Sequence, residues 1–201
     1  MKINNKKLLI GALVFSLLFS SYGFSAGNKR KGKTDTTITN VKTQNILNNF
    51  KVHYHPKTGW MNDPNGLNFN GKEYNMFYQY YPSDTVWGPM HWGHAVSKDL
   101  IKWEEKDIAL YPDHLGMNFS GSAVIDKDNT SGFFSKNTPI DKREVLIYTS
   151  HYEKNGKREE MQSAAYLLDN GNYKRYENNP VIAGNNRKDF RDPKVFFHDG
   201  T

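Results

Sequence analysis

The sequence contains no cysteine among its 201 residues. The absence of cysteine excludes a disulfide scaffold, a thiolate nucleophile and a cysteine-rich zinc site. Long apolar runs are missing as well, because the run Leu8–Phe19 is shorter than the roughly 20 residues that a transmembrane helix needs. A glycine-rich phosphate loop and a serine nucleophile elbow are also absent. These absences argue against thiol chemistry, nucleotide-dependent chemistry and a permanent membrane anchor.

What the sequence does contain is typical of a globular protein rich in β-strands. Hydrophobic residues make up 37%, charged residues 24% and aromatic residues 14% of the chain. The aromatic and charged fractions together exclude a disordered chain. Aromatic side chains are enriched in strands, so this composition favours a β-rich fold.

The N-terminal 26 residues have the three parts of a secretory signal peptide. Three lysines precede the apolar run, and small residues follow it around positions 23–26. We expect cleavage after Ser25 or Ala26 and export of the mature protein, with no membrane segment left. Removal of residues 1–26 takes away three lysines and no acidic residue, which lowers the net charge from +6 to +3. Four basic residues lie in positions 29–33, so the charge does not indicate a nucleic-acid partner.

Residues 27–50 are rich in lysine, threonine and asparagine and predict a polar linker. From residue 51 to 201 the chain predicts short strands and turns. The run Tyr74–Tyr81 follows Asn70-Gly71, a pair typical of a β-hairpin. No long stretch after residue 50 has helical periodicity, so we expect an all-β fold. The other predicted strands are 67–69, 94–97, 121–126, 145–150, 162–168 and 194–197.

An internal repeat distinguishes between a sandwich, a barrel and a propeller. Asp63-Pro64 and Asp192-Pro193 are each followed by a glycine eight residues after the aspartate. The segment 119–125 aligns with 190–196, which gives units at 63, 121 and 192. Their spacing suits propeller blades of roughly 40 to 50 residues with added loops. Because equivalent strand ends of a propeller converge on one axis, we expect Asp63, Ser120 and Asp192 to lie together.

Five ordered motifs closely resemble those of glycoside hydrolase family 32, which includes invertases, levanases and inulinases. The resemblance covers roughly residues 53–201. It implies a five-bladed β-propeller followed by a β-sandwich, of which this chain would hold about two blades, the start of a third and no sandwich. The motifs are Trp60-Met-Asn-Asp-Pro-Asn-Gly66, Phe77-Tyr-Gln-Tyr80, Trp87-Gly-Pro-Met-His-Trp-Gly-His94, Phe119-Ser-Gly-Ser122 and Phe190-Arg-Asp-Pro193.

The resemblance also implies roles for individual residues. Asp63 would be the nucleophile and Asp192 would stabilise the transition state. Two carboxyl groups suit the chemistry, since retaining glycosidases form a covalent intermediate through a transition state with oxocarbenium character. Arg191 could keep the neighbouring carboxylate ionised. The residues that would line the fructose pocket are Trp60, Asn62, Gln79, Trp87, Phe119, Ser120 and Arg191.

One element of the family pattern has no counterpart here. The general acid of the family is a glutamate in a Glu-Cys-Pro-like motif downstream of the Arg-Asp-Pro motif, and we expect it beyond Thr201. Glu153, Glu159 and Glu160 lie upstream in a charged segment that predicts a loop with a solvated face. None of them is assigned as the acid. A polypeptide of these 201 residues alone is therefore expected to aggregate and to hydrolyse neither sucrose nor levan.

The histidines do not indicate a metal site, and we expect no cofactor. His91, His94, His53 and His55 lack a neighbouring set of acidic ligands and predict packing or hydrogen-bonding roles. The expected function is that of a secreted retaining β-fructosidase acting on levan, inulin and sucrose. An invertase that prefers sucrose and a carbohydrate-binding propeller without catalysis are the alternatives. The linkage preference, endo or exo action and the oligomeric state stay open.

Overall fold

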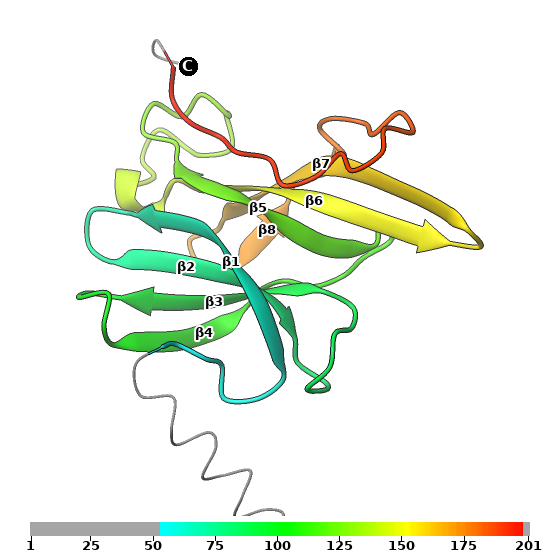
Figure 1. Cartoon of the computed structure of the whole chain (residues 1–201). Helices are drawn as coiled ribbons and strands as arrows, with labels where there is room; N and C mark the ends of the chain where they lie inside the picture. Colours follow the sequence, from blue (N-terminus) through cyan, green and yellow to red (C-terminus); the bar gives the residue numbers. More distant parts are fainter. Residues whose placement is uncertain (1–52, 199–201) are drawn as a thin grey trace, which may run out of the picture. The chain divides into compact units, whose positions relative to one another are not determined.

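The computed structural model describes residues 53–198 (Figure 1). Within this range the chain forms strands and one short 3₁₀ helix, η1 (Ile140–Lys142). No helix among these residues is long and apolar enough to cross a membrane. The predicted signal peptide and linker lie outside the described residues. The strands are β1 (Trp60–Phe69), β2 (Tyr74–Tyr81), β3 (His91–Ser97), β4 (Trp103–Leu110), β5 (Met117–Ile125), β6 (Glu144–Lys154), β7 (Lys157–Leu167) and β8 (Tyr173–Arg175).

The strands form two four-stranded antiparallel sheets in sequence order, β1-β2-β3-β4 and β5-β6-β7-β8 (Figure 1). Four consecutive antiparallel strands make one propeller blade, so the sheets are two successive blades. Their first strands, β1 and β5, contact each other. The predictions of an all-β fold and of a β-propeller are confirmed.

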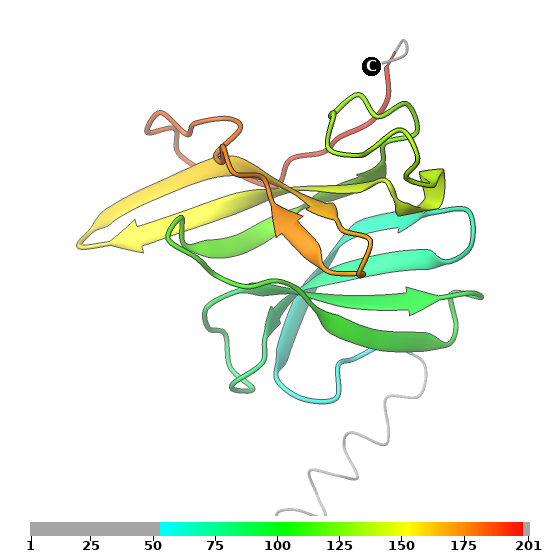
Figure 2. The ribbon, with the colours of Figure 1, turned by 180° about the vertical axis from the view of Figure 1, so that it is seen from behind.

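Aromatic side chains join the two sheets. Alternation along β2 directs Phe77 to one face, where it packs with Trp92, Leu146 and Tyr148. The other face carries Met76, Tyr78 and Tyr80 in a second cluster. Figure 2 shows β8 turned toward the first sheet, and the ring of Tyr173 in β8 lies 5.5 Å from that of Phe77. The second sheet therefore covers the face of β2 that also carries Gln79.

The strand predictions are confirmed for six of the eight strands, and the last strand of each sheet was not predicted. β2 has its predicted bounds, and the other predicted strands up to residue 168 overlap β1, β3, β5, β6 and β7. The Asn70-Gly71 turn joins β1 and β2, with Gly71 at a φ of +98°. β4 and β8 were not predicted from the sequence. The predicted strand at 194–197 is wrong, because the N–H of Val195 donates to the Ser122 hydroxyl instead of joining a strand ladder.

Candidate active site

Asp63 and Ser120 meet at the contact between the first strands of the two sheets. The Ser120 hydroxyl donates a hydrogen bond to Asp63 Oδ2 at 3.0 Å. Both residues lie at register shifts, one between Met61 and Pro64 in β1 and one between Phe119 and Gly121 in β5. A bulge turns the extra residue out of the regular alternation. The same irregularity in two blades thus presents Asp63 and Ser120 to each other.

Asp192 comes to the same place from a segment that follows β8. Its backbone has a φ of +63°, and its N–H donates to the Thr149 hydroxyl at 3.0 Å. Partial burial raises the pKa of the Asp192 carboxyl; the charges of Asp63 and Glu160 raise it further, while Arg191 opposes them. Thr149 is the ladder partner of Phe119, so Asp192 lies beside the part of β5 that carries Ser120. The structure therefore brings together the three residues at which the internal repeat predicted convergence.

Arg191 is held by a buried glutamate that the sequence analysis did not assign. Its Nη1 lies 3.1 Å from Glu160 Oε1 and 2.7 Å from Asp189 Oδ1, and its Nε lies 4.0 Å from Asp192 Oδ2. Burial acts to raise the pKa of Glu160, but hydrogen bonds from Arg158, His151 and Arg191 outweigh it and lower that pKa. An ionised Glu160 orients Arg191 and is poorly suited to donate a proton.

The prediction that Glu160 lies on a solvated face is wrong. Glu160 and His151 are both buried, and His151 Nδ1 donates to Glu160 Oε1 at 3.2 Å. The charged segment, predicted as a loop, is a hairpin of β6 and β7, and residues 160–165 of β7 are buried on both faces of the sheet. Glu153 is exposed, as predicted. Glu160 lies two residues before the predicted strand 162–168, so its burial follows from the greater length of β7.

The predicted pocket residues have different environments. Trp60 Nε1 donates to Asn62 Oδ1 at 2.9 Å, which fixes the orientation of the Asn62 amide. Gln79 is buried between the sheets and donates from Nε2 to the carbonyl of Asn118 at 2.9 Å. The Phe119 ring stacks on His151 with centroids 4.0 Å apart.

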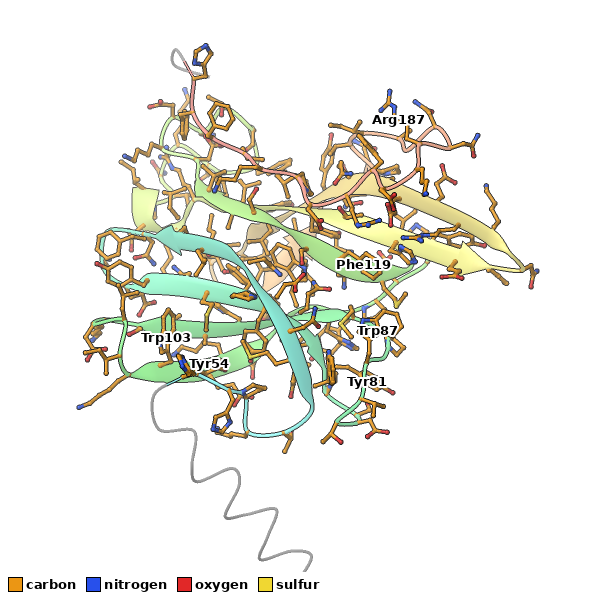
Figure 3. All side chains as sticks on the ribbon, viewed as in Figure 1. Tyr54, Tyr81, Trp87, Trp103, Phe119 and Arg187 are labelled. Atoms are coloured by element: carbon orange, nitrogen blue, oxygen red, sulfur yellow. The ribbon has the colours of Figure 1, made fainter. Side chains whose placement is uncertain are left out.

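Trp87 is 53% exposed in the loop between β2 and β3, and Figure 3 shows it on the same side of the sheets as Phe119. A large exposed aromatic face is suited to contact a sugar ring. Trp87 is therefore available to a ligand, whereas Gln79 acts from inside the fold.

Two of the four histidines singled out in the sequence have packing roles. His94 stacks on Phe77 at 4.5 Å and hydrogen-bonds Asn75 Oδ1 through Nε2. Burial lowers the pKa of His94 to about 4, so its ring is neutral at physiological pH. His91 Nδ1 donates to the Pro89 carbonyl at 2.8 Å. Among residues 53–198, no cluster of three or more histidine or acidic side chains could hold a metal ion.

The fold and the site define a β-propeller protein that has aspartate, serine and arginine side chains gathered where its blades begin. Comparison with known proteins identifies the family. Residues 53–201 match the model of the glycosyl hydrolases family 32 N-terminal domain. The chain is 45% identical over 195 residues to a levanase of Bacillus subtilis, covering 96% of this chain and 26% of that protein. It is 49% identical over 153 residues to an invertase of Schizosaccharomyces pombe. The match covers 73% of this chain and 26% of that invertase.

Solved structures give the same result. The β-fructofuranosidase of Schwanniomyces occidentalis in complex with fructosyl-erythritol matches with a TM-score of 0.66 and 45% identity, over 73% of this chain and 29% of that one. The exo-inulinase of Aspergillus awamori matches with a TM-score of 0.63 and 41% identity, over 74% of this chain and 32% of the inulinase chain. The chain belongs to glycosyl hydrolase family 32. It spans about a quarter to a third of the length of the curated relatives it matches.

Proposed function

We propose that this chain carries the nucleophile and the transition-state carboxylate of a secreted retaining β-fructosidase. Its substrates are levan, inulin and sucrose, from which it releases terminal fructose. The observation that carries the proposal is the hydrogen bond between Ser120 and Asp63, together with the attachment of Asp192 to Thr149, the ladder partner of Phe119.

The mechanism follows from the positions of these groups. Asp63 attacks the anomeric carbon of the fructosyl unit, and the glycosidic bond breaks as the ester bond to Asp63 forms. The Ser120 hydroxyl holds the attacking carboxylate in one orientation. Asp192, ionised when the sugar binds, faces the positive charge that develops on the ring. Water then hydrolyses the ester and restores Asp63, so the configuration of fructose is retained.

The leaving oxygen needs a proton, and Glu160 is a poor source of it. Glu160 is held ionised by the cations around it. The family resemblance expects the acid downstream of the Arg-Asp-Pro motif, in a different segment from both aspartates. A separate glutamate would keep the proton donor apart from the nucleophile, as retention requires.

Substrate binding uses the groups around the two aspartates. The Asn62 amide, oriented by Trp60, and the Arg191 guanidinium offer hydrogen bonds to sugar hydroxyls. Trp87 and Phe119 offer apolar ring faces, and Gln79 supports this wall from within the fold. Export through the predicted signal peptide makes polymeric fructans accessible, and the levanase and inulinase among the relatives are consistent with such substrates.

Replacement of Asp63 by asparagine tests the proposal. Asp63→Asn keeps the side-chain shape and removes the nucleophile, so release of fructose from sucrose and from levan by the full-length protein should fall by several orders of magnitude. Asp107→Asn, at an exposed aspartate of β4, is the matched control and should retain activity. Turnover near that of the unsubstituted protein by Asp63→Asn would overturn the assignment.

A further inference from the structure

Two buried side chains of the second sheet hold the backbone on both sides of Arg191, at the Phe190 carbonyl and at the Asp192 N–H. Gln162 Nε2, in β7, donates to the Phe190 carbonyl at 2.8 Å. Gln162 Oε1 accepts from the Thr149 hydroxyl of β6 at 3.0 Å. The same hydroxyl oxygen accepts from the Asp192 N–H at 3.0 Å. The segment is therefore tied to the sheet at residues 190 and 192 through one connected chain of hydrogen bonds.

The donors and acceptors in this chain of hydrogen bonds allow only one assignment of hydrogen-bond directions. The single proton of the Thr149 hydroxyl goes to Gln162, which leaves the hydroxyl oxygen free to accept from Asp192. The Gln162 amide cannot be reversed, since its NH₂ must face the Phe190 carbonyl and its oxygen must face the Thr149 proton. Thr149 and Gln162 are 0% and 4% exposed, so water does not compete for these bonds.

The segment around Asp192 needs such support because it lies outside the strand ladders. Asp189 and Asp192 both have a positive φ, at 54° and 63°, which is unfavourable for residues other than glycine. The Asp192 side chain is 60% exposed, so packing does not fix it. Just beyond it, the Ser122 hydroxyl donates to the Pro193 carbonyl at 2.9 Å and accepts from the Val195 N–H at 2.9 Å. Side-chain hydrogen bonds thus order this segment at successive points.

We propose that Thr149 and Gln162 are positioning residues, which set the direction of the Asp192 carboxylate toward the reacting sugar without touching it. The inference rests on the proposed role of Asp192. A fixed carboxylate stabilises a developing charge only if its orientation is set in advance. Release of the Asp192 N–H lets the turn rotate, and a displacement of about 1 Å can reduce a rate by a factor of about 10².

Substitution of Thr149 separates positioning from general stability. Thr149→Val keeps the volume and removes the hydroxyl, so kcat for sucrose in the full-length protein should fall about 10- to 100-fold while KM changes little. Thr149→Ser restores the hydroxyl and should recover most of kcat. Gln162→Asn withdraws the amide by one methylene and should give a similar loss. The double variant Thr149→Val/Gln162→Asn should lose no more than the single variants, because both act through one chain.

The neighbouring serine pair provides a matched control. Ser150 of β6 follows Thr149, Ser163 of β7 follows Gln162, and the buried hydroxyl oxygens of these two serines lie 2.8 Å apart, diagonally across the ladder. Ser150→Ala also removes a buried hydrogen bond, but one that does not involve Asp192, and should keep kcat. Equal kcat in Thr149→Val and Ser150→Ala would overturn the inference, as would a loss that Thr149→Ser does not recover. An unchanged kcat in Asp192→Asn would overturn the proposed role of Asp192 itself. A low kcat in Asp192→Asn combined with an unchanged kcat in Thr149→Val would overturn only the positioning role of Thr149 and Gln162.

Discussion

At the scale of single residues, two buried glutamates of the second sheet have opposite electrostatic environments. Glu144 accepts hydrogen bonds from Asn68 Nδ2 and from the Tyr173 hydroxyl, both uncharged donors. Burial raises the pKa of Glu144, and these hydrogen bonds offset that effect only in part. Glu160 is surrounded by arginines, and its pKa is lowered. Glu144 therefore favours the protonated form where the two sheets meet, and Glu160 stays ionised beside the proposed active site.

The raised pKa of Glu144 predicts a pH dependence of stability. A carboxyl group with a folded-state pKa above the unfolded value contributes stability that is present below about pH 4.5 and is lost as the pH rises through the folded-state pKa. Glu144→Gln keeps the shape and cannot ionise. The free energy of unfolding of Glu144→Gln, minus that of the unsubstituted protein, should rise with pH in urea titrations from about pH 4 to about pH 8.

Glu177→Gln, at an exposed glutamate, controls for the loss of one carboxyl group and should show no such trend. A difference that is constant with pH, or that falls as the pH rises, would contradict the account of Glu144.

The residues that could be predicted from the sequence are those that form motifs. Asp63, Gly121 and Asp192 lie at corresponding points of a repeat and Ser120 directly precedes Gly121, so the spacing and propeller geometry predicted that Asp63, Ser120 and Asp192 converge. Thr149, Gln162 and Glu160 contact the Asp192 segment from 43, 28 and 31 residues away in sequence. Their roles depend on which strands pair and on which face each side chain lies. Neither the strand pairing nor the face on which each side chain lies can be predicted from residue type alone.

At the scale of the elements, the close approach of β5 to β6 fixes the position of Ser120. Gly121 follows Ser120 at the register shift, opposite Tyr148 of β6. A Cβ atom at Gly121 would lie 2.1 Å from the Ile147 carbonyl oxygen and 2.7 Å from the Tyr148 Cα. Backbone atoms cannot move aside as a flexible side chain would. The absence of a side chain at this position therefore allows the bulge that presents Ser120 to Asp63.

Gly121→Ala should force β5 and β6 apart. The expected loss of stability is about 1–3 kcal/mol, the usual range for an overpacked site. Hydrogen exchange should accelerate at the amides of the β5–β6 ladder, because the opening is local. Gly71→Ala places a Cβ in open space and adds only the strain of a positive φ at the β1–β2 turn. Gly71→Ala should leave hydrogen exchange at the β5–β6 amides unchanged. Faster exchange at these amides in both variants, or in neither, would contradict the proposed role of Gly121.

The strands differ in how well the sequence predicts them, for a physical reason. β2 is an aromatic run next to an Asn-Gly turn, so local propensity and tertiary packing agree. β4 carries several charged residues because it is an edge strand with an exposed face, and its sequence resembles a loop. β8 has three residues and is defined by its pairing with β7. Edge strands depend on their partners, which a pattern of residues does not contain.

At the scale of the whole molecule, the proposed function depends on convergence between separate parts of the fold. Asp63 belongs to the first sheet, Ser120 to the second, and Asp192 to the segment after the second sheet. The contact of β1 with β5 and the ties of the 190–195 segment to β5, β6 and β7 bring these residues together. The two blades bring Asp63 and Ser120 together, and side-chain hydrogen bonds from the second blade hold the segment that carries Asp192.

The most direct test of this account is to trap the covalent intermediate in the full-length protein with a mechanism-based fluorosugar. The reagent esterifies the nucleophile, and peptide mass spectrometry locates the label. The account predicts the label on the peptide that contains Asp63, and its absence in Asp63→Asn. Label on the peptide that contains Asp192 would reverse the two roles, and turnover of the substrate with no labelled aspartate would contradict the proposed mechanism.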